Sequence, residues 1–178
     1  QHPDQFKVVA LVAHHNIDLL EKQINEYQPL VAGLVDESAF KELQGRYSGP
    51  TKLVGGKEAL IAAATIQEAT MVVTAIVGAA GIEPTVEAIK KGKTIGLANK
   101  ETLVAGGPLI TSLAKEYGVQ ILPIDSEHSA IFQCLEGQDR NNVDSLIVTA
   151  SGGPLRTWDS DKIKTATAAD CLRHPTWN

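Results

Sequence analysis

The stretch MVVTAIVGAAGIEPTVEAIKKGKTIGLA, residues 71–98, decides the fold class of this chain. It begins with a continuous apolar run of strand length, MVVTAIV, and it ends with a second one, TIGLA. Between them, Pro84 stands near the first turn of a helix through Ile89, where its missing backbone N–H is harmless. An apolar strand, a helix and another apolar strand are typical of a parallel sheet, with MVVTAIV as a central strand.

The same alternation continues on both sides of this stretch. Asn16 is placed to cap the first helix, because its side-chain oxygen can accept a backbone N–H. The other expected strands are 6–13, 30–35, 51–54, 119–124 and 145–150, and the other expected helices cover 17–24, 39–43, 58–64 and, opened by Pro108, 108–115. This pattern predicts an α/β fold with a doubly wound, Rossmann-like parallel sheet that runs into the start of an α+β domain.

Composition excludes several classes of protein. The formal net charge is −5 and no long basic run is present, which argues against a nucleic-acid partner. The two cysteines, Cys134 and Cys171, lie far apart, so the sequence supports neither a disulfide framework nor a cysteine zinc site. The apolar runs are too short or too interrupted to span a bilayer. We therefore expect a soluble intracellular protein without a membrane partner.

The turns that follow the strands are where function is expected. Ligands bind beyond the carboxyl ends of the strands in open α/β sheets. Each of these turns is polar or glycine-rich: AHHN (13–16), VGAAG (77–81), ANKE (98–101), DSEH (125–128) and TASGGP (149–154).

The DSEH turn has two interpretations. Asp125 and Glu127 are two residues apart, and in extended backbone both carboxylates point the same way and can share one Mg²⁺ or Mn²⁺. In the other interpretation, Asp125 or Ser126 caps the next helix and Glu127 interacts with its dipole. His128 is then a packed helix residue. The turn alone leaves both open.

The other turns have alternatives as well. Lys100 of ANKE can orient a hydroxyl, carbonyl or phosphate, or form an exposed ion pair with Glu101. Ser151 and the two glycines after it suit an anion-binding turn, or a plain turn. His14 and His15 are a possible metal site or a solvated pair.

Four motifs occur in one order: ANKE, LPIDSEHSAIFQ, TASGGPLR and RHPTW. Together they resemble the 1-deoxy-D-xylulose 5-phosphate reductoisomerase family, and the resemblance runs across essentially the whole chain. It implies an NADPH-dependent and divalent-metal-dependent oxidoreductase with isomerase activity. Such an enzyme converts 1-deoxy-D-xylulose 5-phosphate into 2-C-methyl-D-erythritol 4-phosphate in non-mevalonate isoprenoid biosynthesis. The metal is Mn²⁺ or Mg²⁺, with Co²⁺ a third candidate. The resemblance also implies a homodimer when the enzyme is full length, in the bacterial cytoplasm or the plastid stroma.

The resemblance also assigns roles to residues. It implies that residues 1–124 form an NADPH-binding domain and that residues 125–178 begin the catalytic and metal-binding domain. The catalytic residues would be Lys100 and Glu127, and the metal ligands would be Asp125 and Glu127. Substrate contacts would come from Lys100, Ser126, Glu127, Ser151, His174 and Trp177, the last on a lid. The NADPH site would include His14, His15, Asn16, Asn99 and Glu101.

The sequence departs from the family pattern in three ways. It has no glycine-rich dinucleotide fingerprint, and the third metal carboxylate and the rest of the phosphate site would lie beyond Asn178. His14 and His15 replace the usual Gly and basic or small residue, which leaves NADP preference open. We therefore expect the chain to be incomplete at both ends and inactive alone. Competing hypotheses are a homoserine or aspartate-semialdehyde type dehydrogenase, or a non-catalytic nucleotide-binding module, for which no Mn²⁺ binding is expected.

Overall fold

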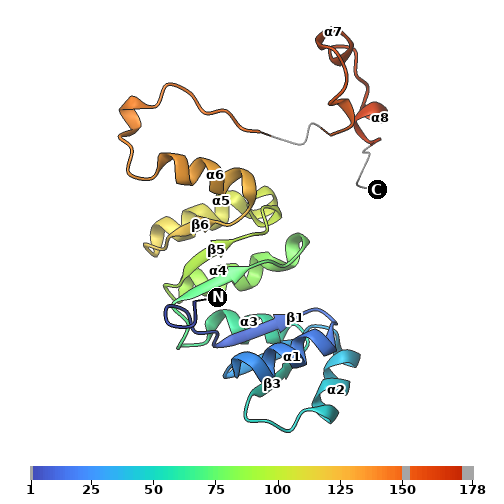
Figure 1. Ribbon diagram of the computed structural model, residues 1–178, viewed down its shortest axis with the longest axis vertical. Helices are drawn as coiled ribbons and strands as arrows, with labels where there is room; N and C mark the ends of the chain where they lie inside the picture. Colours follow the sequence, from blue (N-terminus) through green and yellow to red (C-terminus); the bar gives the residue numbers. More distant parts are fainter. Residues whose placement is uncertain (1, 150–152, 174–178) are drawn as a thin grey trace. The chain divides into compact units, whose positions relative to one another are not determined.

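The structure is a computed structural model that describes residues 2–149 and 153–173 (Figure 1). The chain divides into two compact units, residues 1–125 and 126–178. The first unit contains all the strands of the described residues, and the second contains helices and extended segments. The strands and helices of the first unit alternate, which confirms the expected α/β class with parallel sheets.

The first sheet is three-stranded, parallel and ordered β1-β2-β3. Its strands are β1 (Ala10–Ala13), β2 (Val31–Leu34) and β3 (Lys52–Gly55), and its helices are α1 (Ile17–Tyr27), α2 (Glu37–Arg46) and α3 (Glu58–Thr65). The first strand is shorter than the expected 6–13, because its ladder with β2 begins only at the pair Ala10 and Val31. Phe6, before the ladder, is 69% exposed.

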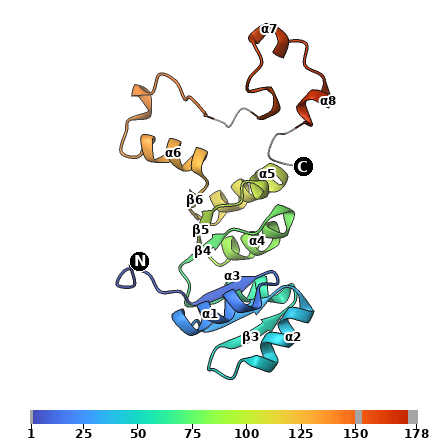
Figure 2. The ribbon, with the colours of Figure 1, turned by 45° about the vertical axis from the view of Figure 1, so that its right-hand side comes forward.

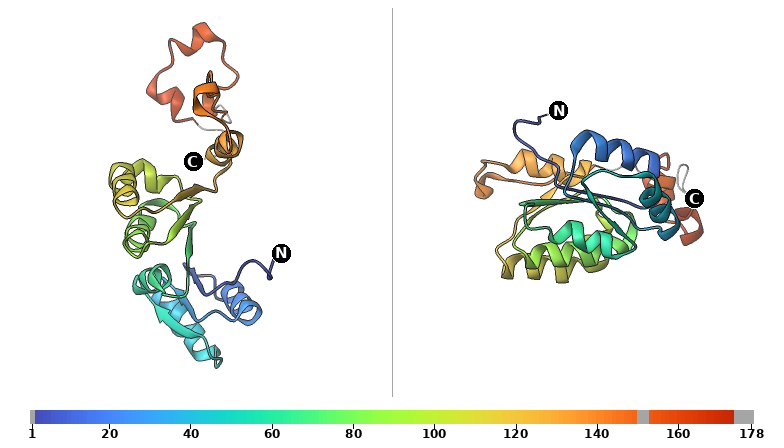
Figure 3. Two further views of the ribbon diagram at one scale, coloured as in Figure 1. Left: turned by 90° about the vertical axis from the view of Figure 1, so that its left-hand side faces the viewer. Right: turned by 90° about the horizontal axis from the view of Figure 1, so that it is seen from below.

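Helices cover both faces of this first sheet. Ala32 and Leu34 of β2 are buried in a cluster with Leu20 of α1 and Leu43 of α2. Gly33, between them, points to the other face, where a Cβ atom would lie 2.6 Å from the Cβ of Ala59 in α3. Successive residues of β2 therefore face different helices: one face of the strand packs on α1 and α2, and the other packs on α3. Figure 3 (right) shows α1 and α3 on opposite sides of the strands.

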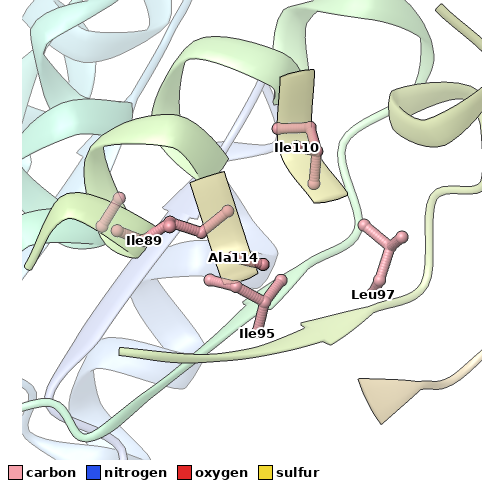
Figure 4. Packing of buried hydrophobic residues seen from close by; sticks show 7 residues of the cluster. Ile89, Ile95, Leu97, Ile110 and Ala114 are labelled. Atoms are coloured by element: carbon pink, nitrogen blue, oxygen red, sulfur yellow. The ribbon is translucent and has the colours of Figure 1, made fainter. Parts of the chain in front are cut away.

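The second sheet is also three-stranded and parallel, in the order β4-β5-β6. It consists of β4 (Met71–Thr74), β5 (Thr94–Leu97) and β6 (Ile121–Pro123), joined through the 3₁₀ helix η1 (Gly78–Gly81), α4 (Ile82–Lys90) and α5 (Glu101–Glu116). Figure 2 shows α4 and α5 on the same side of these strands. The core under them contains Ile89, Ile95, Leu97, Ile110 and Ala114 (Figure 4).

Two expectations about this sheet were wrong in detail. MVVTAIV was expected as a central strand, but β4 ends at Thr74 and lies at the edge of its sheet. Met71 and Val73 are 42% and 59% exposed, because α4 and α5 cover only the opposite face. The six strands form two sheets rather than one, and α3 links them by contacting both the first sheet and α4.

The start of α5 also differs from the sequence-based expectation. Pro108 was expected to open this helix, but the helix begins at Glu101 and Pro108 lies inside it. The helix starts without Pro108: Lys100 is the N-cap and makes no side-chain cap bond, while the Asn99 side chain, one residue earlier, accepts the Glu101 backbone N–H. Val104, whose carbonyl cannot bond to the proline nitrogen, is 82% exposed, so water can reach this turn.

The second unit begins with α6 (Ser126–Leu135). It continues through the 3₁₀ turns η2 (Arg140–Asn142) and η3 (Gly153–Leu155) and the short helices α7 (Ser160–Ile163) and α8 (Ala168–Cys171). The strand expected at 145–150 is wrong for residues 145–149, since no described segment forms a ladder with them. Within the described part of the chain, no helix has the length and apolar character that crossing a membrane requires.

Candidate functional site

Two of the polar turns lie side by side at the carboxyl ends of neighbouring strands. The VGAAG turn follows β4 and the ANKE turn follows β5, and these strands are paired from Met71 to Thr74. The backbone amides of Ala98 and Asn99 both donate to the Thr74 carbonyl, at 3.0 and 3.2 Å. The Asn99 side chain then donates from Nδ2 to the Gly78 carbonyl at 3.1 Å. The two turns are therefore fastened to each other.

The Asn99 side chain is buried and both ends of its amide are used. It is 6% exposed, and its Oδ1 accepts the Glu101 N–H at 2.9 Å while its Nδ2 donates to Gly78. Lys100, the next residue, is exposed and precedes the first residue of α5. This geometry holds the Lys100 backbone at the carboxyl end of β5, where a ligand-facing side chain is expected.

Threonines surround the same two turns. The Thr85 hydroxyl donates to the Gly81 carbonyl at 2.6 Å. A larger residue at position 81 would crowd its neighbour, because a Cβ there would lie 3.1 Å from the Thr102 Oγ1. The hydroxyl oxygens of Thr74 and Thr102 are buried and have no hydrogen-bond partner among the described residues. The turns thus keep buried polar groups at the end of the sheet where ligands bind.

The DSEH residues lie where a strand passes into a helix. Asp125 is the last residue of the first unit, and α6 begins at Ser126. Glu127 is therefore in the first helical turn and not in extended backbone, so the expected alternation of side chains does not apply here. The Ser126 hydroxyl donates to the Glu127 Oε2 at 2.9 Å. An acidic residue in this position is also favoured by the helix dipole.

These residues suit a hard divalent cation by their chemistry. Carboxylate and hydroxyl oxygens are the donors that Mg²⁺ and Mn²⁺ accept, and water completes the coordination when protein ligands are few. Among residues 2–149 and 153–173, no group of three or more His, Cys, Asp and Glu side chains is arranged to hold a metal ion. The described residues therefore offer two carboxylates, Asp125 and Glu127, as candidate ligands.

The first polar turn places two imidazoles together after β1. The Nδ1 atoms of His14 and His15 are 3.1 Å apart, and the rings meet edge to face. Asn16 caps α1, as expected, by accepting the Leu19 N–H at 3.1 Å. The Asn16 side-chain oxygen is therefore used to cap α1, directly after the histidine pair in the sequence.

Asp36 is a neighbour of this turn that the sequence reading missed. It follows β2, and its backbone N–H donates to the His14 carbonyl at 2.9 Å. Its carboxylate accepts the Ser38 hydroxyl at 2.6 Å and the Ala39 N–H at 2.8 Å. The hydrogen bond from Ser38, and to a smaller extent that from Ala39, lowers the pKa of Asp36 below its usual 3.8. The nearby His14 lowers this pKa a little further. An aspartate between a strand and a helix is a cap signal that could have identified it.

The remaining site predictions lie outside the described residues. Ser151, His174 and Trp177, which the family resemblance assigns to the substrate and its lid, belong to this part of the chain. The predicted roles of the other residues, from Lys100 to the metal ligands, stay predictions as well.

The fold and its polar turns define a class of protein. A parallel α/β unit with helices on its sheets and polar groups at the carboxyl ends of its strands is the arrangement of nucleotide-dependent enzymes with a doubly wound domain. The sequence pattern of 1-deoxy-D-xylulose 5-phosphate reductoisomerase matches residues 1–107, and that of its C-terminal domain matches residues 121–178. The chain belongs to the 1-deoxy-D-xylulose 5-phosphate reductoisomerase family.

Individual proteins agree with this assignment. A 1-deoxy-D-xylulose 5-phosphate reductoisomerase from a Geobacillus species is 47% identical over 177 residues, 99% of this chain and 46% of the relative. The Zymomonas mobilis reductoisomerase in complex with NADPH has a TM-score of 0.80 at 38% identity, covering 97% of this chain and 45% of that one. A reductoisomerase complex with NADPH, fosmidomycin and magnesium has a TM-score of 0.79 at 34% identity, covering 100% and 47%. The chain spans about half the length of the relatives it matches.

Proposed function

We propose that this chain carries the cofactor-facing and first metal-binding parts of a reductoisomerase. That enzyme converts 1-deoxy-D-xylulose 5-phosphate into 2-C-methyl-D-erythritol 4-phosphate with NADPH and Mn²⁺ or Mg²⁺. The single observation that carries the proposal is the placement of Asp125 directly before α6, and of Ser126 and Glu127 in its first turn, just after β6 in a chain of this family. The related structures, which contain NADPH and magnesium, support the choice of cofactors. Both matching family patterns and the relatives described above are reductoisomerases, which supports this proposal over the two alternative hypotheses.

The residues have distinct roles in this proposal. Asp125 and Glu127 hold the divalent cation, and the Ser126 hydroxyl orients the Glu127 carboxylate by its hydrogen bond. Lys100 binds substrate oxygens from the start of α5. When bound, the metal supplies a Lewis acid and NADPH supplies hydride. The turns after β1 and β5, with His14, Asn99 and their neighbours, line the cofactor site and exclude water from it.

The proposal extends to the substrate class and the assembly. One related reductoisomerase binds fosmidomycin together with NADPH and magnesium, which supports a small-molecule substrate, here a sugar phosphate. Ser151, His174 and Trp177 would complete its site. The full-length enzyme would be a homodimer in the bacterial cytoplasm or the plastid stroma, with residues 1–124 and 125–178 serving the cofactor and the metal.

A grafted enzyme tests this proposal. In it, this chain replaces the matching segment of the Geobacillus relative, which aligns with 99% of the chain. We expect NADPH oxidation that requires both 1-deoxy-D-xylulose 5-phosphate and Mn²⁺. The matched control is a graft with Asp125→Asn and Glu127→Gln, which keeps side-chain volume and should lose metal-dependent turnover. A grafted enzyme that binds NADPH but never turns over would contradict the proposal.

A further inference from the structure

Asn99 joins three separate parts of the first unit. Its backbone amide bonds to the Thr74 carbonyl at the end of β4, and its Oδ1 accepts the Glu101 N–H at the start of α5. Its Nδ2 donates to the Gly78 carbonyl, 21 residues earlier in the sequence. A buried amide with both ends paired between backbone groups has one orientation, since flipping it would place two donors and two acceptors face to face.

The turn that Asn99 contacts has a backbone that depends on glycine. Gly78 has a φ of +75°, which side chains with a Cβ rarely adopt, while no atom lies within 4 Å of the position of a Cβ there. A side chain at position 78 would therefore disturb the backbone conformation without a steric clash. Substitutions at position 78 and at position 99 should therefore both disturb the hydrogen bond between the Asn99 Nδ2 and the Gly78 carbonyl.

We propose that Asn99 is a positioning residue that fastens the VGAAG turn to the ANKE turn, so that the two turns present their groups to the cofactor as one rigid unit. One donor and one acceptor of the Asn99 side chain are engaged within the chain, and these two bonds fix its orientation beside the cofactor site. For its effect on cofactor use, this inference rests on the proposed function. The contact itself does not depend on that function.

The substitution Asn99→Asp separates two roles of this side chain. Aspartate keeps an acceptor for the Glu101 N–H, and its charge suits the N-terminus of α5. It has no donor for the Gly78 carbonyl, however, and places a carboxylate oxygen against that carbonyl. Asn99→Ala removes both contacts. The matched control is Asn25→Asp, on the exposed surface of α1.

The first measurement is hydrogen exchange in the cofactor-free grafted enzyme. Asn99→Asp and Asn99→Ala should both speed exchange of the Ile82 amide, which bonds to the Ala79 carbonyl, by about tenfold. Asn25→Asp should leave it unchanged. If Asn99→Asp exchanges like the unsubstituted enzyme and only Asn99→Ala is faster, the Asn99 side chain matters only through the Glu101 N–H and the proposal fails.

The second measurement is a double-mutant cycle on the KM for NADPH. Asn99→Asp and Gly78→Ala should each raise this KM by about tenfold, with a smaller effect on kcat, and the double variant should be no worse than either one. If the increase in KM of the double variant equals the product of the two single increases, Asn99 acts on the cofactor independently of Gly78, and the proposal is overturned. If the Asn99 variants do not fold, Gly78→Ala decides alone: unchanged exchange and KM would overturn it. An inactive unsubstituted graft would count against the proposed function only, because the exchange result still decides the contact.

Discussion

Glu127 is the residue whose charge matters most to the proposed chemistry. Glu127→Gln keeps the volume of the side chain and an oxygen that can accept the Ser126 hydroxyl, but it removes one negative charge and one hard ligand. In the grafted enzyme we expect turnover to fall by about 100-fold or more, with weaker Mn²⁺ binding and little change in the unfolding temperature.

The control for Glu127 is Glu136→Gln, one residue beyond the end of α6 and exposed. It removes the same charge from the same unit and should leave turnover within the error of the assay. Turnover of Glu127→Gln near that of the control would show that Glu127 is not a ligand and that the helix-start interpretation is sufficient.

Asp36 predicts a specific dependence of stability on pH. Its pKa is below 3.8 in the folded chain because the carboxylate accepts hydrogen bonds from Ser38 and Ala39. The folded state therefore binds fewer protons here than the unfolded state. The stabilisation is fully present above pH 3.8 and is lost as the pH falls through the lower, folded pKa.

The matched variant is Asp36→Asn, which can still cap α2 but does not titrate. Urea unfolding of the grafted enzyme at about pH 5 and about pH 3 measures the difference. The unsubstituted enzyme should lose more stability than Asp36→Asn between these conditions. Parallel losses would mean that the Asp36 hydrogen bonds are no stronger in the folded chain than those to water.

At the residue scale, local signals were predictable and long-range ones were not. Asn16 was identified as a cap because its partner, the Leu19 amide, lies three residues away. Asn99 was assigned to the cofactor site by resemblance, and its bond to Gly78 could not be read from the sequence, because the partner lies in another turn. For Glu127 the sequence left extended backbone and a helix start as alternatives, and the structure places it in the first turn of α6.

At the scale of elements, one buried lysine links α3 to β5. Lys93 is 5% exposed, and its ammonium donates to the carbonyls of Ile66, just after α3, and Ala69. Burial lowers the pKa of Lys93, while Glu68 raises it by a smaller amount. The KKGK turn looks like a solvated charged loop in the sequence, so nothing local distinguishes Lys93 from its neighbours.

Removing this link should destabilise the first unit. Lys93→Met keeps an unbranched side chain but leaves two carbonyls without their donor, and we expect a loss of about 2 kcal/mol in the free energy of unfolding. Thermal unfolding of the grafted enzyme measures this loss. Lys91→Met, at an exposed position of the same turn, is the control. A Lys93→Met variant as stable as the control would mean that desolvation of the ammonium cancels its hydrogen bonds.

Periodicity predicted the elements well, and it did not predict how they end or how the strands are ordered. The helix that contains Pro108 was expected to begin there because proline suits a first turn, but the helix begins at Glu101, whose backbone N–H is accepted by the Asn99 side chain. Strand order depends on hydrogen bonds between segments far apart in sequence, so the edge position of β4 was not visible.

At the scale of the whole molecule, residues 2–149 and 153–173 leave strand edges unpaired and apolar side chains of β4 exposed. β1 and β4 each lie at an edge of a sheet, and their outer edges have no ladder partner among the described residues. Met71 and Val73 of β4 are 42% and 59% exposed. Unpaired strand edges and exposed apolar side chains favour association with other chains. We therefore expect the 178-residue chain, prepared alone, to self-associate.

Size-exclusion chromatography of Val73→Lys tests the cause of this association. The side chain at position 73 is more than half exposed, so lysine should cost little packing while placing a charge on the open face of the sheet. We expect a larger monomer fraction than for Val104→Lys, which adds the same charge on the exposed surface of α5. Equal fractions would show that the open face of β4 does not drive association.

A separate prediction for the chain prepared alone concerns catalysis, which needs a metal site and a dinucleotide site. Among its described residues no group of three or more His, Cys, Asp and Glu side chains is arranged to hold a metal ion, and its sequence lacks the glycine-rich dinucleotide fingerprint that binds a pyrophosphate. Two carboxylates can still hold Mn²⁺ weakly, with water in the other positions. We expect no oxidation of NADPH when the chain is mixed with Mn²⁺ and 1-deoxy-D-xylulose 5-phosphate, under conditions in which the grafted enzyme turns over. Turnover by the chain comparable to that of the graft would mean that Asp125, Glu127 and Lys100 suffice for the reaction.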